Sequence, residues 1–170
     1  MNDSEVKLNE SNESGVTFSA SLPMRLHRAL DAVLPPFRAL FADYDLTEQQ
    51  WRVLRVLWEQ PGLTQSALSH ETLIPSNSLV GVLDRLERRA LIVRLRSTSD
   101  RRLVHVRATP AGLALGEQIR PKLEPIYAAL AARLGAEKLA HLYEALDALD
   151  ALDAVCEEKF TKEKKTHVAR

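Results

Sequence analysis

The sequence contains one cysteine, Cys156, and no apolar run long enough to form a membrane-spanning helix. A single cysteine excludes a disulfide framework and an all-cysteine metal site. A bilayer span needs about 20 consecutive apolar residues, so we expect no transmembrane helix. The polar, acidic stretch 1–15 has no apolar signal core, and we therefore expect a cytoplasmic protein.

Net charge is also absent, because 23 Lys and Arg residues balance 23 Asp and Glu residues. A zero net charge argues against a wholly basic nucleic-acid coat. The charge is unevenly placed, however. Residues 74–107 hold eight arginines and three carboxylates (8 − 3 = +5), whereas residues 135–158 hold one lysine and seven carboxylates (1 − 7 = −6). Arginine suits phosphates and base edges, so the basic block is either a nucleic-acid surface or a solvated face.

The amino-terminal third predicts a disordered leader followed by one helix. Residues 1–20 are rich in Ser, Asn and Glu, and we expect them to be mobile. Ser21 can cap a helix over residues 21–45 in which apolar side chains recur at helical spacing. Pro35 and Pro36 lie inside this pattern and predict a kink or a break.

Three further helices are predicted in the middle of the chain. Thr47 and Gln50 form a capping box for a helix that ends at Pro61-Gly62. Thr64 can cap a short helix to about Thr72, and residues 74–76 start a fourth. The core side of the fourth helix would carry Leu79, Val82, Leu83, Leu86 and Ala90, and the opposite side Asn77, Gly81, Asp84 and Arg88.

After Ala90 the apolar period changes to two, which indicates strands at 91–96 and 103–107 joined by a hairpin loop at 97–102. Thr109-Pro110 then starts a long helix toward Gly135. A last helix is expected from about Ala136 to Cys156.

This order of elements is that of a winged helix-turn-helix, so we predict a mostly α fold with a small β-hairpin. The alternative is a plain α+β domain whose hairpin only packs. We assign residues 46–109 to the DNA-binding lobe, 21–45 and 110–157 to dimerisation helices, and 158–170 to a mobile basic tail. Apolar helices at both chain ends suggest a two-fold homodimer, which would read a palindromic site in double-stranded DNA.

Candidate DNA contacts lie in the short helix, the fourth helix and the hairpin. Residues 76–78 either cap the fourth helix or contact DNA. Arg85 and Arg88 either contact phosphates or pair with Asp84 and Glu87. The full set is Thr64, Gln65, Ser66, Ser76, Asn77, Ser78, Gly81, Arg85, Arg88, Arg96, Ser97, Asp100, Arg101 and Arg102.

Taken together, the segments 46–54 (LTEQQWRVL), 83–88 (LDRLER), 100–102 (DRR) and 109–112 (TPAG) resemble the MarR family of bacterial regulators. The resemblance spans roughly residues 22–152, and 79–83 (LVGVL) is most similar to the branch that represses homoprotocatechuate degradation. It implies a homodimeric repressor that is released by a small, often aromatic and acidic, ligand. Ala90 departs from the family, which usually has glycine there. If that position needs a positive φ, alanine costs about 1 kcal/mol.

In this family the ligand pocket is bordered by the first two predicted helices. A carboxylate ligand would need an arginine, which can hold it with two hydrogen bonds. The candidate ligand contacts are Arg25, His27, Arg28, Arg38, Trp51 and Arg52, and Trp51 also suits the core.

We therefore predict a ligand-responsive repressor of an aromatic-acid operon, released by an aromatic carboxylate or its thioester. The alternative is a winged-helix protein-interaction module without DNA binding. No catalytic constellation or histidine metal spacing is present, so we expect no enzyme, no cofactor and no metal. Acidic residues flank Cys156 in the sequence, and because negative neighbours oppose thiolate formation we expect no redox sensing there.

Overall fold

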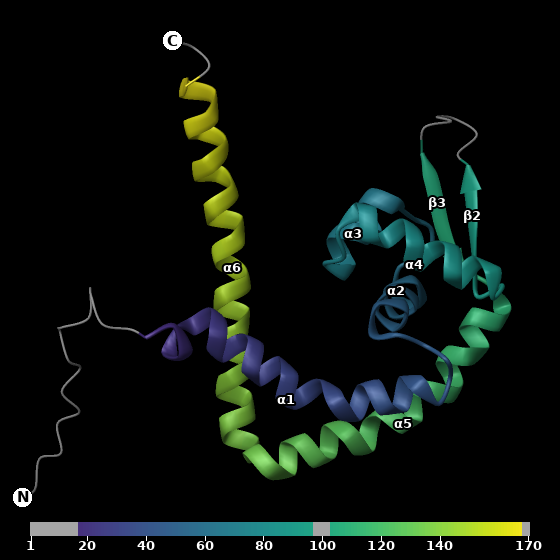
Figure 1. The fold of residues 1–170 in the computed structure, drawn as a ribbon, viewed down its shortest axis with the longest axis horizontal. Coiled ribbons are helices and arrows are strands. Elements are labelled where there is room, and N and C mark those ends of the chain that lie inside the picture. The colour runs from purple at the N-terminus through teal and green to yellow at the C-terminus, as the bar shows by residue number, and fades with distance from the viewer. Residues whose placement is uncertain (1–16, 97–102, 168–170) are drawn as a thin grey trace, which may run out of the picture. The chain divides into compact units, whose positions relative to one another are not determined.

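A computed structural model describes residues 17–96 and 103–167 of the 170-residue chain, with side chains described as far as Leu152. Two compact units are separated between Ile119 and Arg120. The elements in chain order are η1 (Phe18–Ala20), α1 (Leu22–Ala42), α2 (Glu48–Glu59), β1 (Leu63–Thr64), α3 (Gln65–Thr72), α4 (Ser76–Arg88), β2 (Ile92–Arg96), β3 (Val104–Ala108), α5 (Pro110–Leu134) and α6 (Ala136–His167) (Figure 1). The predicted fold class, mostly α with a small β-hairpin, is confirmed.

Three helix starts in the first unit are fixed by threonine caps at the predicted positions. The main-chain N–H of Gln50 donates to Thr47 Oγ1 (3.3 Å), and Thr47 N–H donates to Gln50 Oε1 (2.8 Å), which completes the capping box of α2. Thr64 Oγ1 accepts from the main chain of α3, and Thr109 Oγ1 accepts from Gly112 N–H (3.1 Å) in α5. Each cap contributes about 1 kcal/mol and sets where its helix begins.

The amino-terminal predictions need three corrections. Helix α1 runs unbroken through Pro35 and Pro36, because the two carbonyls that lose a partner belong to exposed residues and can bond to water. Ser21 is the first cap residue as predicted, but its hydroxyl donates to Phe18 O (2.7 Å) and does not cap α1. The 3-10 turn η1 lies within the predicted leader, whereas residues 1–16 lie outside the described part of the chain.

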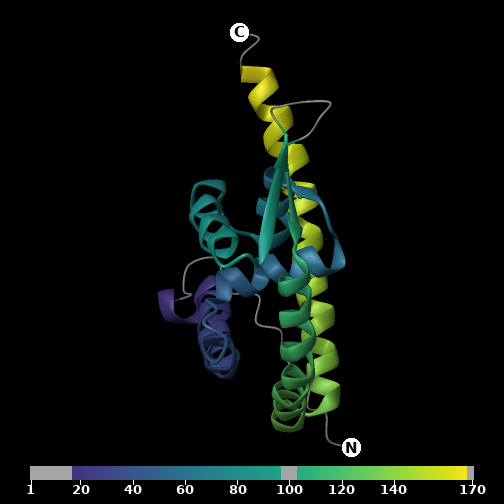
Figure 2. The ribbon, with the colours of Figure 1, turned by 90° about the vertical axis from the view of Figure 1, so that its right-hand side faces the viewer.

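A three-stranded antiparallel sheet stands beside the helices in the order β1-β3-β2. β2 and β3 pair from Ile92↔Ala108 to Arg96↔Val104 and stand side by side in Figure 2. The two-residue strand β1 pairs with β3 and was not predicted, because two residues are too few to show a period.

The core of the first unit lies between α2, α3, α4 and the sheet. Its fully buried side chains include Phe41, Leu54, Leu57, Leu68, Ile74, Leu79, Leu83, Leu86 and Ile92. The four predicted core leucines and valines of α4 are buried, but Ala90 is exposed, lies beyond α4 and has a φ of +54°. The prediction that Ala90 belongs to the core is therefore wrong. The positive φ that we considered for this position is confirmed.

Helix α5 approaches the lobe through two glycines. A Cβ atom on Gly112 would collide with the Leu91 carbonyl oxygen, and one on Gly116 would lie 2.7 Å from the Trp58 ring. The Trp58 indole N–H donates to Gly112 O at 3.1 Å. These contacts hold the first turns of α5 directly against α2 and the start of the hairpin.

The second unit consists of the rest of α5 and all of α6. Helix α5 continues through Pro121 and Pro125, and α6 reaches His167, beyond the predicted end near Cys156. We attribute the longer α6 to the Glu and Lys residues after Cys156, which favour helix although they break the apolar pattern. No helix among the described residues is long and apolar enough to cross a bilayer.

Candidate nucleic-acid interface

Helix α4 has one buried side and one polar side. Four apolar residues face the core, while Asn77, Gly81, Asp84 and Arg88 follow one another along the opposite side at about 100° per residue. Ser76, Asn77, Ser78, Arg85 and Arg88 are all exposed. The structure therefore places the predicted DNA contacts of α4 together on one accessible side of the helix.

The first turn of α4 does not cap itself. Pro75 is the N-cap residue and has no side-chain cap hydrogen bond, so none of residues 76–78 is the N-cap of α4. Asn77 Oδ1 accepts from the Ser78 main chain (2.9 Å), and the Ser76 and Ser69 hydroxyls are 3.1 Å apart. These polar side chains are thus displayed at the positive end of the α4 dipole, where an anion is favoured.

The start of α3 supplies less exposed candidates. The Thr64 hydroxyl accepts a hydrogen bond from Ala67 N–H (3.2 Å) and so caps the helix. Gln65 is half-buried, and Ser66 is exposed. Of these three residues, Ser66 is the most accessible to a partner.

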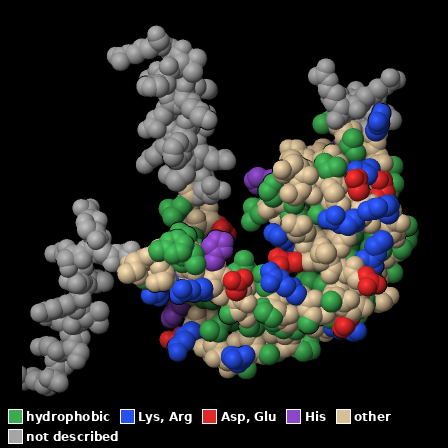
Figure 3. Space-filling model, viewed as in Figure 1, with side chains coloured by type: hydrophobic (Ala, Val, Ile, Leu, Met, Phe, Trp, Pro, Cys, Tyr) green, Lys and Arg blue, Asp and Glu red, His purple; other side chains and the backbone are tan. Residues whose placement is uncertain are grey.

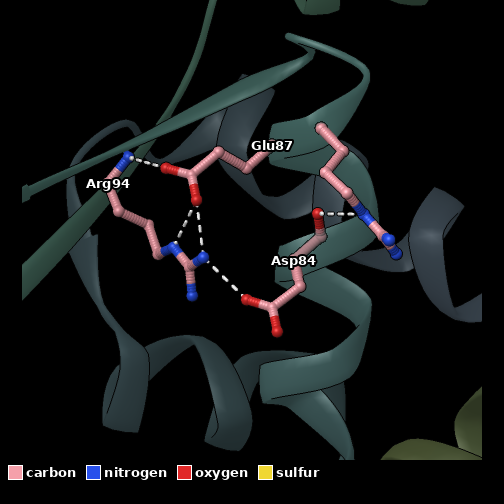
Figure 4. Close-up of polar contacts among 4 residues, drawn as sticks. Asp84, Glu87 and Arg94 are labelled. Carbon is pink, nitrogen blue, oxygen red and sulfur yellow. Dashed lines mark hydrogen bonds and ion pairs between the residues drawn. The ribbon is translucent and has the colours of Figure 1, made fainter.

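Arg94 of β2 binds both carboxylates of α4, as Figure 4 shows. Its Nη2 lies 2.6 Å from Asp84 Oδ1 and 2.5 Å from Glu87 Oε2, and its Nε lies 2.9 Å from the same Glu87 oxygen. The main-chain N–H of Arg94 also donates to Glu87 Oε1 (3.3 Å). The hydrogen bond from Arg94 lowers the pKa of Glu87, and the bond to Glu87 raises the pKa of Arg94. We call Asp84, Glu87 and Arg94 the ion triad.

The ion triad argues against one of the two roles that the sequence left open for Arg85 and Arg88, the pairing with Asp84 and Glu87, while their contact with phosphates stays a prediction. The carboxylates of Asp84 and Glu87 bind Arg94, whereas Arg88 Nε donates to the Asp84 main-chain carbonyl (3.3 Å). Sequence reasoning missed Arg94. The period of two places Arg94 on the same strand face as buried Ile92, and this signal could have shown that it points toward α4.

The hairpin adds exposed positive charge near this surface. Arg96 ends β2, pairs with Val104 and is exposed. On the face drawn in Figure 3, Lys and Arg side chains gather beside Asp and Glu side chains below the hairpin. Four predicted contacts, Ser97, Asp100, Arg101 and Arg102, lie outside the described residues.

The candidate ligand contacts fall into two separate groups. Arg25 Nε donates to Ala20 O (3.2 Å), and Arg28 Nη1 donates to Ser19 O (3.4 Å), so both hold the η1 turn on α1. His27 is exposed on the same stretch of helix.

The second group surrounds Glu48 at the start of α2. Arg38 donates to Glu48 Oε2 (3.1 Å), and Arg52 Nη2 lies 3.7 Å from Glu48 Oε1. Arg52 Nη1 donates to Thr72 O (3.0 Å), which links α2 to the end of α3. Trp51 is buried and stacks on Phe41 with ring centroids 4.6 Å apart, so its place is in the core.

Comparison with known proteins identifies the fold and its relatives. The sequence model of the MarR family matches residues 46–104. The homoprotocatechuate degradative operon repressor of Escherichia coli is 35% identical over 127 residues, which are 75% of this chain and 86% of that protein. NadR in complex with 4-hydroxyphenylacetate superposes with a TM-score of 0.71 at 32% identity, over 79% of this chain and 98% of NadR. The repressor CouR, bound to a 23-mer DNA duplex, gives a TM-score of 0.71 at 31% identity, over 77% of this chain and 93% of CouR. The chain therefore belongs to the MarR family of transcriptional regulators.

Proposed function

We propose that the protein is a homodimeric repressor of an aromatic-acid catabolic operon, released from a palindromic operator by an aromatic carboxylate or its thioester. The observation that carries the DNA-binding part is the exposed polar side of α4 beside the arginine-bearing hairpin. A helix of this kind enters the major groove and reads base edges from its amino-terminal turns. CouR, which has the same fold, is bound to a DNA duplex.

On this proposal, residues 76–78 contact bases or nearby phosphates, and Gly81 lets α4 approach the groove closely. Arg85 and Arg88 lie toward the carboxyl end of the same side and bind phosphates. Arg96 and, among the predicted loop contacts, Arg102 would reach the minor groove, whose negative potential attracts arginine. Residues 46–109 then form the DNA-binding lobe.

The dimer part of the proposal rests on exposed apolar side chains. Leu22, Leu26 and Leu30 recur every four residues along α1, so they share one side of the helix, and all three are exposed in the single chain. In α6, Leu142, Tyr143 and Leu152 are exposed as well. Such surfaces are typical of a subunit interface. We expect a two-fold dimer that buries more than about 2,000 Å² in total.

The effector part rests on the relatives and on arginine chemistry. The Escherichia coli relative is named for homoprotocatechuate degradation, and NadR is described with 4-hydroxyphenylacetate. One of Arg25, Arg28, Arg38 or Arg52 would hold the effector carboxylate through two hydrogen bonds. Effector binding would favour a dimer whose lobes are wrongly spaced for the operator, with a coupling of about 1–3 kcal/mol.

The test is a DNA-binding titration with the full chain. Fluorescence anisotropy on duplexes from the region upstream of its own gene should find a site bound at least about 1,000 times more tightly than a scrambled duplex. Hydroxyphenylacetates, hydroxybenzoates and hydroxycinnamates are then added to the preformed complex, and at least one should release it. Arg55→Ala serves as a control, because Arg55 pairs with Glu59 on α2 and lies outside both candidate sites.

The outcomes separate the parts of the proposal. A folded dimer that binds no duplex supports the alternative of a protein-interaction module. If a specific complex forms but none of the acids releases it, only the prediction of an aromatic effector is contradicted.

A further inference from the structure

We infer that Arg94 is a positioning residue for DNA binding, which ties the hairpin to α4 so that both contact DNA as one rigid unit. This inference rests on the proposed DNA-binding function. It adds a role for a residue that touches neither base nor phosphate.

The geometry fixes the orientation of β2 as well as its distance from α4. Arg94 is bound through its guanidinium group and through its main-chain N–H, both to Glu87. Asp84 receives a further hydrogen bond one helical turn earlier. The planar guanidinium group therefore bridges two carboxylates that lie one turn apart on α4, and a rigid fork of this kind restricts rotation better than a single contact does.

Among the described residues of β2, Arg94 is also the last one before the loop whose side chain is held against the lobe. It lies opposite Val106, which is fully buried, and its own side chain is only 25% exposed. Beyond Arg94 toward the loop, Leu95 and Arg96 of β2 are exposed. On β3, Val104 and His105 are half-buried, and His105 pairs with Thr64 of β1 and has its Nδ1 2.9 Å from Gly62 O. The direction in which β2 leaves the lobe therefore depends on the ion triad, whereas β3 is held by β1 and by Gly62.

The positive charge of Arg94 is neutralised within the protein. It faces two carboxylates, so the triad carries +1 − 2 = −1. Asp84 lies in line with Gly81 and Arg88 on the polar side of α4, where an uncompensated carboxylate would repel DNA phosphates. Arg94 is therefore a partner of these carboxylates rather than one of the phosphate-binding arginines.

The charge of the ion triad and its positioning role predict opposite changes in DNA affinity when the triad is removed. The triple variant Arg94→Met, Asp84→Asn, Glu87→Gln removes the tie and changes the triad charge from −1 to 0. Charge alone then predicts tighter DNA binding. Loss of position predicts binding that is at least about tenfold weaker, because the hairpin no longer reaches its contact.

Arg96→Ala supplies the second readout. In the wild-type protein it should weaken binding and lower the slope of log affinity against log salt by about one. In the triple variant it should change little, because the hairpin contact is already lost. Arg94→Lys keeps the charge without the fork and should bind with intermediate affinity. The control removes another ion pair, by Arg55→Met with Glu59→Gln on α2, and should bind as the wild type does.

Circular dichroism and sedimentation confirm that each variant is folded and has the wild-type oligomeric state. A triple variant that binds as tightly as the wild type, or more tightly, overturns the inference. So does an Arg96→Ala effect of the same size in both backgrounds. If the wild type binds no DNA specifically, the proposed function fails first and this inference fails with it.

Discussion

The guanidinium group of Arg89 donates a 2.5 Å hydrogen bond to the main-chain carbonyl oxygen of Asp45. A second bond reaches the carbonyl of Tyr44 at 2.9 Å, and the Tyr44 hydroxyl lies 3.5 Å from Gln118 O of α5. The cap of α4 is therefore joined to the turn between α1 and α2.

Arg89→Ala should lower the free energy of unfolding by about 1 kcal/mol, because two carbonyl acceptors lose a charged donor. Urea denaturation followed by circular dichroism measures the change. Arg85→Ala is the control, since Arg85 lies in the last turn of the same helix and shares its dipole effect. Equal losses in the two variants would show that the bonds to the turn contribute nothing.

Leu73 is strained at the turn between α3 and α4. Its φ is +52° and its side chain is 82% exposed, so the strain has no compensating burial. The left-handed conformation costs a non-glycine residue about 1–2 kcal/mol, and glycine costs about 0.5–1 kcal/mol in unfolded-state entropy. Leu73→Gly should therefore stabilise the protein by roughly 0.5–1 kcal/mol in urea titrations.

Ala90, with a φ of +54°, provides an independent test of the same effect. Ala90→Gly should also stabilise the protein, and Leu73→Ala should not, because alanine keeps the strain. A destabilising Leu73→Gly together with a stabilising Leu73→Ala would contradict this explanation.

Gly116→Ala should destabilise the first unit, because its new Cβ would lie 2.7 Å from the Trp58 ring. Overpacking of this kind costs about 1–3 kcal/mol. The loss should shrink when Trp58 is already replaced by Phe, whose ring lacks the atoms in the way. Thermal unfolding of the two single variants and the double variant measures this coupling, and strictly additive losses would exclude the contact as the cause.

The ion triad should weaken in acid. The pKa of Glu87 is lowered in the folded protein by its hydrogen bond from Arg94, so its contribution is present above the ordinary glutamate pKa. It is lost as the pH falls through the lowered folded value. The raised pKa of Arg94 acts in the opposite direction: its contribution is fully present below the ordinary arginine pKa and is lost as the pH rises through the raised folded value. A carboxyl NMR titration should find that the pKa of Glu87 lies below the ordinary glutamate value of about 4.5. In the Arg94→Met variant the pKa of Glu87 should return to that value.

The proposed dimer is tested by charge on the apolar side of α1. Leu26→Glu should shift the protein toward monomer in sedimentation, because a buried unpaired carboxylate opposes association. Leu103→Glu is a matched control, since Leu103 of the hairpin is 42% exposed and Leu26 is 40% exposed. A dimer that survives Leu26→Glu would exclude this side of α1 from the interface.

Local signals made much of the lobe predictable. The Thr47, Thr64 and Thr109 caps depend on residues within one turn, so the sequence alone placed three helix starts. A kink or a break was predicted at Pro35 and Pro36, and the break is wrong, because its cost depends on whether water can reach the freed carbonyls. The pairing of Arg94 across α4 and β2 depends on tertiary contact, which a single sequence shows only weakly.

The ligand candidates illustrate the same limit. All six are on the predicted helices, but Arg25 and Arg28 bind the η1 turn while Arg38 and Arg52 share Glu48. Helical spacing shows which side of one helix an arginine occupies. It does not show which carboxylate of another helix will pair with that arginine. The DNA and ligand contacts therefore stay predictions.

The two tryptophans of the chain, Trp51 and Trp58, meet edge to face within α2, with ring centroids 5.1 Å apart. Trp51 stacks on Phe41 of α1, and Trp58 bonds to the first turn of α5. Tryptophan fluorescence, excited selectively over Tyr127 and Tyr143 of the second unit, is therefore a label-free reporter of the first unit alone, whereas far-ultraviolet circular dichroism follows the helices of both units. Denaturation curves from the two signals will coincide only if the units unfold together.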